Sequence, residues 1–233
     1  MATNDKDKRK GKARGAKGVI IANWPSGGES HSPDDDPFWA AAVDEGMPVS
    51  IHINIISRAQ RAAARKAEAQ SGITRYDMSS AATRAKAIGG MSHVFSHSAG
   101  AMTQMLFSGV FERFPALRIC WIEIGVGWLP HFLESLDDRY WRNRSWGKLA
   151  ITEPPSFYWY RNNAATFITD RSGIALRHAA GVDNIMWSSD YPHHGNDWPY
   201  SRKVIDETMG HIPADERERI CGGNAARIWD LSA

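Results

Sequence analysis

The sequence of 233 residues is poor in cysteine, and it has neither a long apolar run nor a large excess of one charge. Cys120 and Cys221 could form at most one disulfide, and two cysteines cannot provide a cysteine-rich zinc site. No run of 18 apolar residues exists, which argues against a membrane-spanning helix. Met1 is followed by charged residues without the apolar stretch of a secretory signal. These absences predict a soluble, cytoplasmic protein.

The charge balance gives no reason to expect a nucleic-acid or membrane partner, because 28 basic and 26 acidic residues leave a net charge of only +2. Seven of the basic residues lie in the charged N-terminal segment 1–17, which has no aromatic residue for base stacking. We interpret this segment as a solvated tail; the alternative is a basic arm that binds nucleic acid or acidic lipid.

Phosphate-binding and serine-hydrolase motifs are also missing. The sequence contains neither G-x-x-x-x-G-K-[ST] nor a G-x-G-x-x-G that follows an apolar run, which argues against a doubly wound nucleotide-binding domain. It has no G-x-S-x-G nucleophile motif either.

What the sequence does have is an alternation of short apolar runs and amphipathic segments, and 42% hydrophobic residues supply a packed core. Runs of this kind predict strands buried on both faces, joined by helices in a parallel sheet. We therefore expect one α/β domain over residues 18–233. The expected strands are Gly18–Asn23, Pro48–Ile55, Leu117–Ile124, Ala165–Thr169 and Asn184–Asp190. The expected helices include Asp36–Gly46, Arg58–Gln70, Ser98–Phe114, Leu129–Arg142, Ser172–Ala180, Ser201–Thr208 and Ala214–Gly222.

Three ionisable residues lie at the ends of separate predicted strands: His52, Glu123 and Asp190. Because the chemistry of parallel α/β folds sits at the carboxyl ends of the strands, we expect these side chains to converge. Imidazole and carboxylate groups are ligands of divalent metals. Each residue also has a structural alternative: a core histidine bonded to a carbonyl, a salt bridge from Glu123 to an internal arginine, and a turn or helix cap at Asp190. His193 is expected in the loop above the same site.

Several segments together resemble the amidohydrolase-related family, the metal-dependent TIM barrels that include aminocarboxymuconate-semialdehyde decarboxylase and resorcylate-type decarboxylases. The segments are DPFWAAAVDEGMPVSIHI, FERFPALRICWIEIGVGWLPHFLESLDDRYW, VDNIMWSSDYPH and GGNAARIWDL. The resemblance implies a (β/α)8 barrel, of which this chain carries about five βα units that resemble strands four to eight. It implies that His52 and Asp190 are metal ligands, and that Glu123 stands where the decarboxylases have a catalytic histidine. Neither predicted strand up to His52 contains a His-x-His or Glu-x-His pair like that of the family's first strand; the Glu-x-His triplet Glu29–His31 lies in the turn after the first predicted strand.

From this resemblance we expect a metal-dependent carboxy-lyase or hydrolase that acts on a small aromatic or cyclic carboxylic acid. The expected cofactor is a divalent metal, Zn²⁺ or alternatively Mn²⁺. Glu123 and Asp190 are the expected catalytic residues, and His193 and Trp128 the expected substrate contacts. The competing hypothesis is a catalytically incomplete barrel fragment. An open five-stranded sheet has two unpaired edges, which favours either a homo-oligomer or an unstable chain.

Overall fold

A computed structural model describes residues 12–53, 55, 57–71, 78–91 and 94–231 of the chain. Five parallel strands form one sheet in the order β1-β2-β3-β4-β5. They are β1 (Val19–Ile21), β2 (Val49–His52), β3 (Ile119–Ile122), β4 (Asn163–Phe167) and β5 (Ile185–Trp187). Each strand pairs with its neighbour in the sequence, as in a barrel, whereas the strand order of a doubly wound sheet reverses. The predicted α/β fold with five strands is therefore confirmed; within the described residues the sheet is open, with β1 and β5 at its edges.

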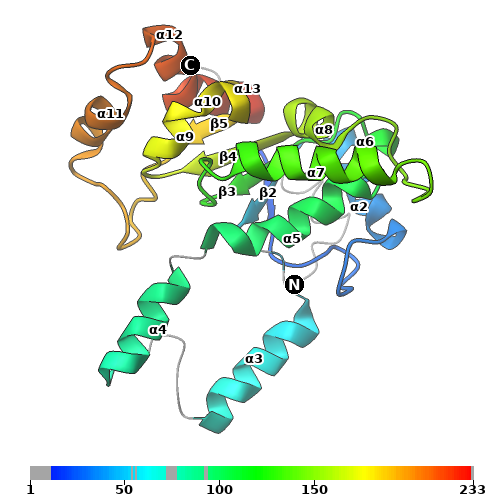
Figure 1. Cartoon of the computed structure of the whole chain (residues 1–233), viewed down its shortest axis with the longest axis horizontal. Helices are drawn as coiled ribbons and strands as arrows, with labels where there is room; N and C mark the ends of the chain where they lie inside the picture. The colour runs from blue at the N-terminus through cyan, green and yellow to red at the C-terminus, as the bar shows by residue number, and fades with distance from the viewer. Residues whose placement is uncertain (1–11, 54, 56, 72–77, 92–93, 232–233) are drawn as a thin grey trace.

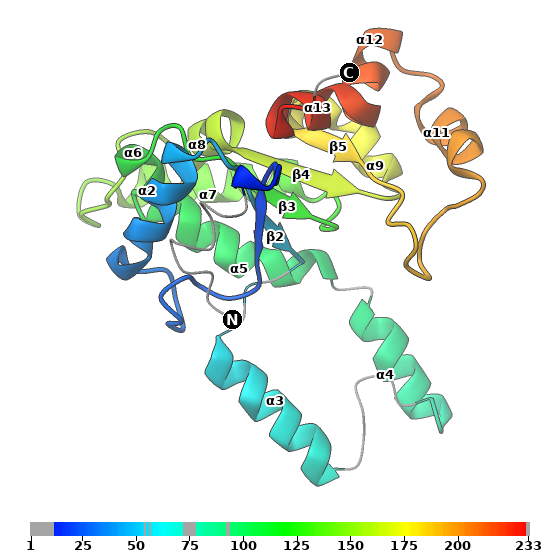
Figure 2. The same cartoon turned by 180° about the vertical axis from the view of Figure 1, so that it is seen from behind.

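Helices connect the strands and cover mainly one face of the sheet. Helices α5 and α7 lie in front of the strands in Figure 1, whereas α13 lies on the opposite side and is in front in Figure 2. The helices are α2 (Asp36–Asp44), α3 (Arg58–Ser71), α4 (Ala81–Met91), α5 (Val94–Phe107), α6 (Val110–Arg113), α7 (Leu129–Asn143), α8 (Pro155–Asn162), α9 (Arg171–Ala175), α10 (Arg177–Ala180), α11 (Ser201–Met209), α12 (Ala214–Glu218) and α13 (Asn224–Trp229), together with the 3-10 turn η1 (Pro33–Asp35) and the π-helical turn η2 (Arg219–Gly223).

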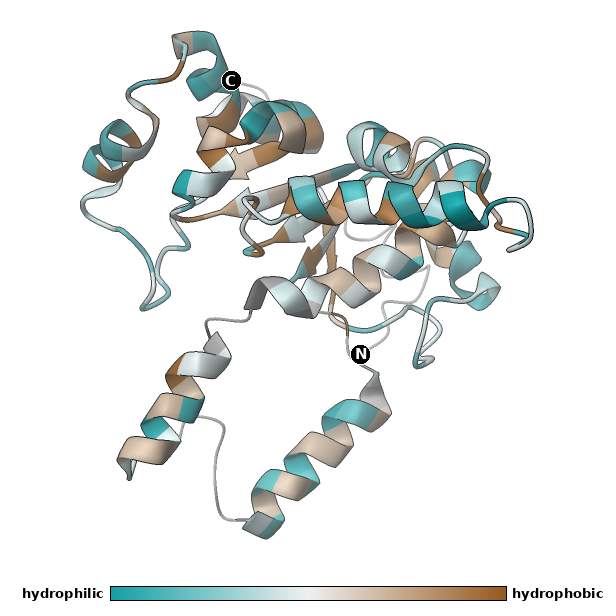
Figure 3. Cartoon of the chain, in the orientation of Figure 1, coloured by the Kyte–Doolittle hydropathy of each residue, from teal (hydrophilic) through white to brown (hydrophobic). Residues whose placement is uncertain are grey.

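The hydrophobic core lies between the sheet and the helices of the covered face. Alternate strand residues such as Val49, Ile51, Ile119 and Trp121 have no exposed surface, and they pack with apolar side chains of α5, α6 and α7. The brown strands of Figure 3 show this concentration of apolar residues. This burial provides the main stabilisation of the sheet, and it fixes which side chains point to the other face.

The second face carries a much smaller apolar cluster. Cys120, Ala164 and Met186 are buried there against Ile228 and Trp229 of α13. At the edge of the same face, Ile20 of β1 is 63% exposed. Within the described residues, α13 thus covers only part of this face.

Two helices depart from the globular body. Helices α3 and α4 project away from the sheet (Figure 1), and the side chains of α3 are polar or small and mostly exposed. Among the described residues, no helix is both long and apolar enough to cross a membrane.

Some boundaries differ from the prediction. The helix expected over Ser98–Phe114 is two helices, α5 and α6, because Gly109 adopts a left-handed φ of 71° between them. A side chain at Gly109 would place its Cβ 2.5 Å from the Ala150 carbonyl oxygen, so the break requires glycine. Helix α8 was not expected, and the expected segment Ser172–Ala180 divides into α9 and α10. Residues 1–11 of the predicted tail and residue 54 of the second expected strand lie outside the described residues.

Candidate metal and proton-transfer site

The candidate site lies at the carboxyl edge of the sheet. His52 is the last residue of β2 and is paired in register with Ile122, so Glu123 follows directly beside it at the end of β3. Asp190 follows β5 after two serines, and His193 lies one turn further along the same loop. The parallel strands therefore deliver all four side chains to one edge, as the sequence predicts.

Their side-chain atoms are close together. His52 Nε2 lies 2.8 Å from Glu123 Oε2, and His193 Nδ1 lies 2.8 Å from Asp190 Oδ2. One ligand atom each from Glu123, Asp190 and His193 lie within 4.8 Å of one another. His52 is not part of this group and contacts it through Glu123. Within the described residues, the close side-chain partner of Glu123 is thus a histidine and not the arginine of the structural alternative.

The backbone at this edge is strained. Ile53, Glu123 and Asp190 have φ values of 60°, 63° and 56°, which is the left-handed region that non-glycine residues rarely adopt. Each residue follows a strand of the same sheet. Such conformations cost about 1–3 kcal/mol each and occur most often at functional sites, where surrounding contacts hold them.

Two residues that the sequence analysis missed hold the Glu123 turn in place. The backbone N–H of Glu123 donates to Thr166 Oγ1 at 2.7 Å, from the neighbouring strand β4. The Asp170 carboxylate accepts the backbone N–H groups of Val126 and Gly127 at 2.6 and 2.7 Å. A Cβ at Gly127 would lie 2.7 Å from Asp170 Oδ1, so the G-V-G sequence after Glu123 makes room for this carboxylate. That pair of glycines was the available sequence signal.

The donor set fits a divalent metal. Two ligands that are each about 2.1 Å from one ion lie at most about 4.2 Å apart, which a group spanning 4.8 Å reaches with a small adjustment. Asp190 Oδ2 is buried, and no hydrogen bond within the described residues satisfies it, although His193 Nδ1 is nearby. A buried carboxylate oxygen that lacks a well-directed hydrogen bond is stabilised by a cation. All four side chains, including that of Asp190, remain partly exposed, which leaves access for a small molecule.

Trp128, an expected substrate contact, lies at the start of α7 close in sequence to Glu123. Its indole N–H donates to the Ile124 carbonyl at 3.0 Å, and its ring packs at a tilt against Phe132 with centroids 4.9 Å apart. It is partly buried. These contacts fix the indole, and its role toward a substrate stays a prediction.

Comparison with known proteins agrees with this architecture. The chain matches the amidohydrolase family profile over residues 2–231 and belongs to that family, so the resemblance seen in the motifs is confirmed. It is 30% identical over 215 residues to the decarboxylase orsB of Emericella nidulans, an alignment that covers 91% of this chain and 60% of that protein.

Solved structures of decarboxylases share the fold. The 5-carboxyvanillate decarboxylase LigW from Sphingomonas paucimobilis has a TM-score of 0.71 and 26% identity, over 99% of this chain and 64% of that one. A dihydroxybenzoic acid decarboxylase from Polaromonas sp. JS666, solved with manganese and the inhibitor 2-nitroresorcinol, has a TM-score of 0.67 and 18% identity, over 97% and 64%. The chain thus spans less than two thirds of the length of these relatives.

Proposed function

We propose that this chain carries the metal-binding and proton-transfer residues of a non-oxidative decarboxylase that acts on a small aromatic carboxylic acid. The observation that carries the proposal is the convergence of Glu123, Asp190 and His193 around a buried carboxylate oxygen without a hydrogen bond. The names of the relatives support this reaction over hydrolysis, since orsB and LigW are both described as decarboxylases.

Asp190 is the central metal ligand in this proposal, and His52 is its partner from the sequence prediction. The short contact of Asp190 with His193 makes His193 an alternative second ligand, which would leave His52 and Glu123 for proton transfer. Relatives bind manganese, so Mn²⁺ is the first metal to test and Zn²⁺ the second. A divalent cation bound there would act as a Lewis acid toward the substrate carboxylate or a neighbouring oxygen.

The residues of the chain would then deliver one proton to the substrate. In the reaction, the bond between the ring carbon and the carboxylate breaks, its electron pair stays on the ring carbon, and that carbon takes a proton as CO₂ leaves. Glu123 is the proposed proton donor, because its carboxylate is only 21% exposed and faces the site. Where His193 rather than His52 is the second metal ligand, His52 Nε2, which lies 2.8 Å from Glu123 Oε2, would return the proton to Glu123.

The test is an assay of the purified chain with Mn²⁺ or Zn²⁺ and 2,6-dihydroxybenzoate or 5-carboxyvanillate, read by product formation. Glu123→Gln keeps the shape of the side chain and is expected to lower kcat by about 10²–10⁴-fold, the usual contribution of a general acid. Glu134→Gln, an exposed position on α7, is the matched control and should leave kcat unchanged. Full activity of Glu123→Gln would contradict the assignment of the proton donor.

Two further measurements distinguish His52 from His193 as the metal ligand, and an active enzyme from an incomplete barrel. Loss of bound metal in His52→Ala but not in His193→Ala would support the ligand pair predicted from the sequence, and the reverse would support the pair that is in contact here. A wild-type chain that folds and binds metal without turning over either acid would favour the competing hypothesis of an incomplete barrel.

A further inference from the structure

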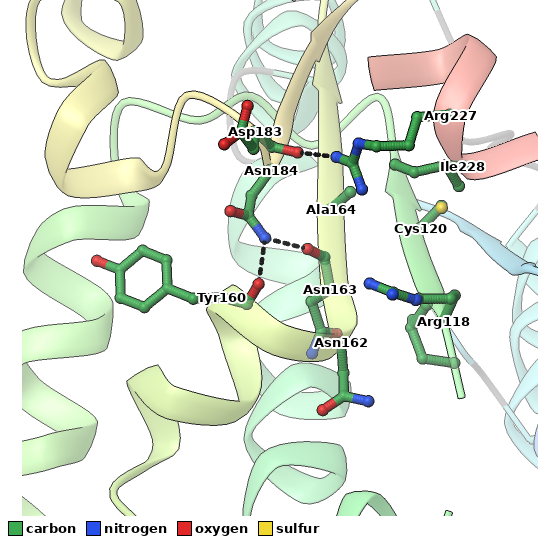
Figure 4. Close-up of a pocket in the computed structure, with 11 residues that line it drawn as sticks. Arg118, Cys120, Tyr160, Asn162, Asn163, Ala164, Asp183, Asn184, Arg227 and Ile228 are labelled. Carbon is green, nitrogen blue, oxygen red and sulfur yellow. Dashed lines mark hydrogen bonds between the residues drawn. The ribbon is translucent and has the colours of Figure 1, made fainter. Parts of the chain in front are cut away.

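A small pocket lies at the amino edge of the sheet, opposite to Glu123 and Asp190. It is formed at the starts of β3, β4 and β5 and by α13 (Figure 4). Its volume is about 60 Å³, which is room for about four water molecules. The charged residues among its lining are Arg118, Asp183 and Arg227.

Most polar groups of the lining are already satisfied by protein. The Asn162 amide donates to the carbonyls of Pro115 and Leu117 at 3.0 and 2.8 Å. The Asn184 amide donates to the carbonyls of Asn163 and Tyr160 at 2.7 and 3.0 Å. These amides satisfy backbone acceptors and have no N–H left for a ligand.

The Asp183, Tyr160 and Cys120 side chains of the lining also offer no free charge or donor to a ligand. The Asp183 carboxylate is paired with Arg219, whose Nη1 is 3.0 Å away. The Tyr160 hydroxyl donates to the Ala179 carbonyl at 2.7 Å. Burial raises the pKa of the Cys120 thiol to about 12, so this group is neutral.

The two arginines are different, because each uses only one nitrogen for protein contacts. Arg118 Nη1 donates to the Arg161 carbonyl at 2.9 Å, and Arg227 Nη2 donates to the Asp183 carbonyl at 2.6 Å. Within the described residues, neither guanidinium has a carboxylate within 4.0 Å. Both arginines are exposed, and a guanidinium has five N–H donors, so each retains donors that a ligand can reach from solvent.

Both charges act on the same small volume. In Figure 4 the Arg227 and Arg118 side chains lie on the same side of β4, Arg227 above Arg118, and both guanidinium groups point toward this strand. Both arginines line the same pocket as the Cys120 thiol, and both lower its pKa against the larger effect of burial. Two cations that share a pocket repel each other unless an anion lies between them.

We propose that Arg118 and Arg227 form a binding site for a small oxyanion of the phosphate class. Guanidinium forks match the geometry of phosphate oxygens and bind them in pairs of parallel hydrogen bonds. The pocket is too small for the aromatic acid of the proposed reaction, and it lies at the opposite end of the strands. The site is therefore independent of the proposed activity.

The experiment is a titration of the full chain with inorganic phosphate at constant ionic strength, followed by calorimetry and by the unfolding temperature. At a phosphate concentration ten times the Kd, the unfolding temperature should rise by about 3–5 °C. Methyl phosphate in a parallel titration distinguishes free phosphate from the phosphate group of a larger molecule. Binding of either anion supports the proposal.

Substitutions in the pocket are expected to change the affinity for phosphate in opposite directions. Arg118→Gln and Arg227→Gln are each expected to weaken phosphate binding about tenfold, since each removes charge-assisted hydrogen bonds. Arg227→Lys keeps a donor for the Asp183 carbonyl and replaces Arg227→Gln if that variant does not fold. Asp183→Asn removes the negative charge of the lining and should tighten binding severalfold. Arg202→Gln, exposed on α11, is the control for loss of one surface charge.

The proposal is wrong if phosphate shifts the unfolding temperature no more than sodium chloride of equal ionic strength. It is equally contradicted if the double variant Arg118→Gln/Arg227→Gln binds phosphate as the wild type does.

Discussion

The two edges of one sheet use their polar side chains in opposite ways. At the amino edge, the amides of Asn162, Asn163 and Asn184 bond to backbone carbonyls and to the Trp121 indole. At the carboxyl edge, residues in left-handed conformations carry partly exposed ionisable groups, and the buried Asp190 Oδ2 lacks a hydrogen bond within the described residues. The same strands thus place satisfied amides at one end and ionisable groups at the other, the end at which barrel folds carry their chemistry.

The largest expected effect on stability lies at the amino edge. Asn163 is buried; its Nδ2 donates to the Tyr158 carbonyl at 2.9 Å, and its Oδ1 accepts the Trp121 indole N–H at 2.9 Å. Asn163→Ala leaves both partners buried and unpaired, so we expect the free energy of unfolding to fall by about 3 kcal/mol. Urea unfolding measures this change. Asn143→Ala, on the surface of α7, is the control; a similar loss there would remove the distinction between buried and surface amides.

Two aspartates at the carboxyl edge are expected to respond differently when each is replaced by asparagine. Asp170 accepts three backbone N–H groups, from Val126, Gly127 and Gly173, whereas Asp190 Oδ2 has no hydrogen bond within the described residues. We expect Asp170→Asn to destabilise the chain by about 2 kcal/mol. Asp190→Asn in metal-free protein should instead be neutral or stabilise it by about 1 kcal/mol, because the substitution removes the repulsion between the Asp190 and Glu123 carboxylates and loses only the partly exposed contact with His193. Equal losses in both variants would contradict a functional reading of Asp190.

The smallest effect is a pH dependence that originates in the loop after β1. Burial lowers the pKa of His31 below 6.5, with Asp35 opposing, and the ring lies between Trp24 and Trp39. Because the unfolded chain binds a proton at higher pH than the folded chain, stability should decline as the pH falls below about 6.5. His31→Gln should flatten the change in unfolding temperature between pH 7.5 and 5.5, measured by calorimetry. The exposed His211→Gln should leave it as in the wild type, and an identical flattening there would exclude His31 as the source.

Much of the fold could be predicted from local sequence. Short apolar runs identified all five strands, because each is buried on a helix-covered face and bounded by turns. Strand β4 begins two residues earlier than expected, at Asn163, since its side chain is satisfied by Trp121 and Tyr158 from distant segments. Helix α8 was missed because its aromatic residues gain their stability from tertiary packing rather than from helix propensity.

The site was predictable only in part. The positions of His52, Glu123 and Asp190 at strand ends follow from the rule that chemistry lies at the carboxyl edge. Two contacts could not be predicted: that between His52 and Glu123, and that between His193 and Asp190. Both depend on residues with a left-handed φ, and the sequence gives no signal for this conformation at residues other than glycine. The support from Thr166 and Asp170 is likewise a contact between separate βα units.

The most direct test of the central claim is calorimetric titration of the metal-free chain with Mn²⁺, compared between wild type and Asp190→Asn. The account predicts one bound Mn²⁺ per chain in the wild type and a loss of affinity of at least about 100-fold in Asp190→Asn, with Asp138→Asn on the surface of α7 binding as the wild type does. Undiminished binding by Asp190→Asn, or a well-folded wild type that takes up no metal, would contradict a cation site at the carboxyl edge.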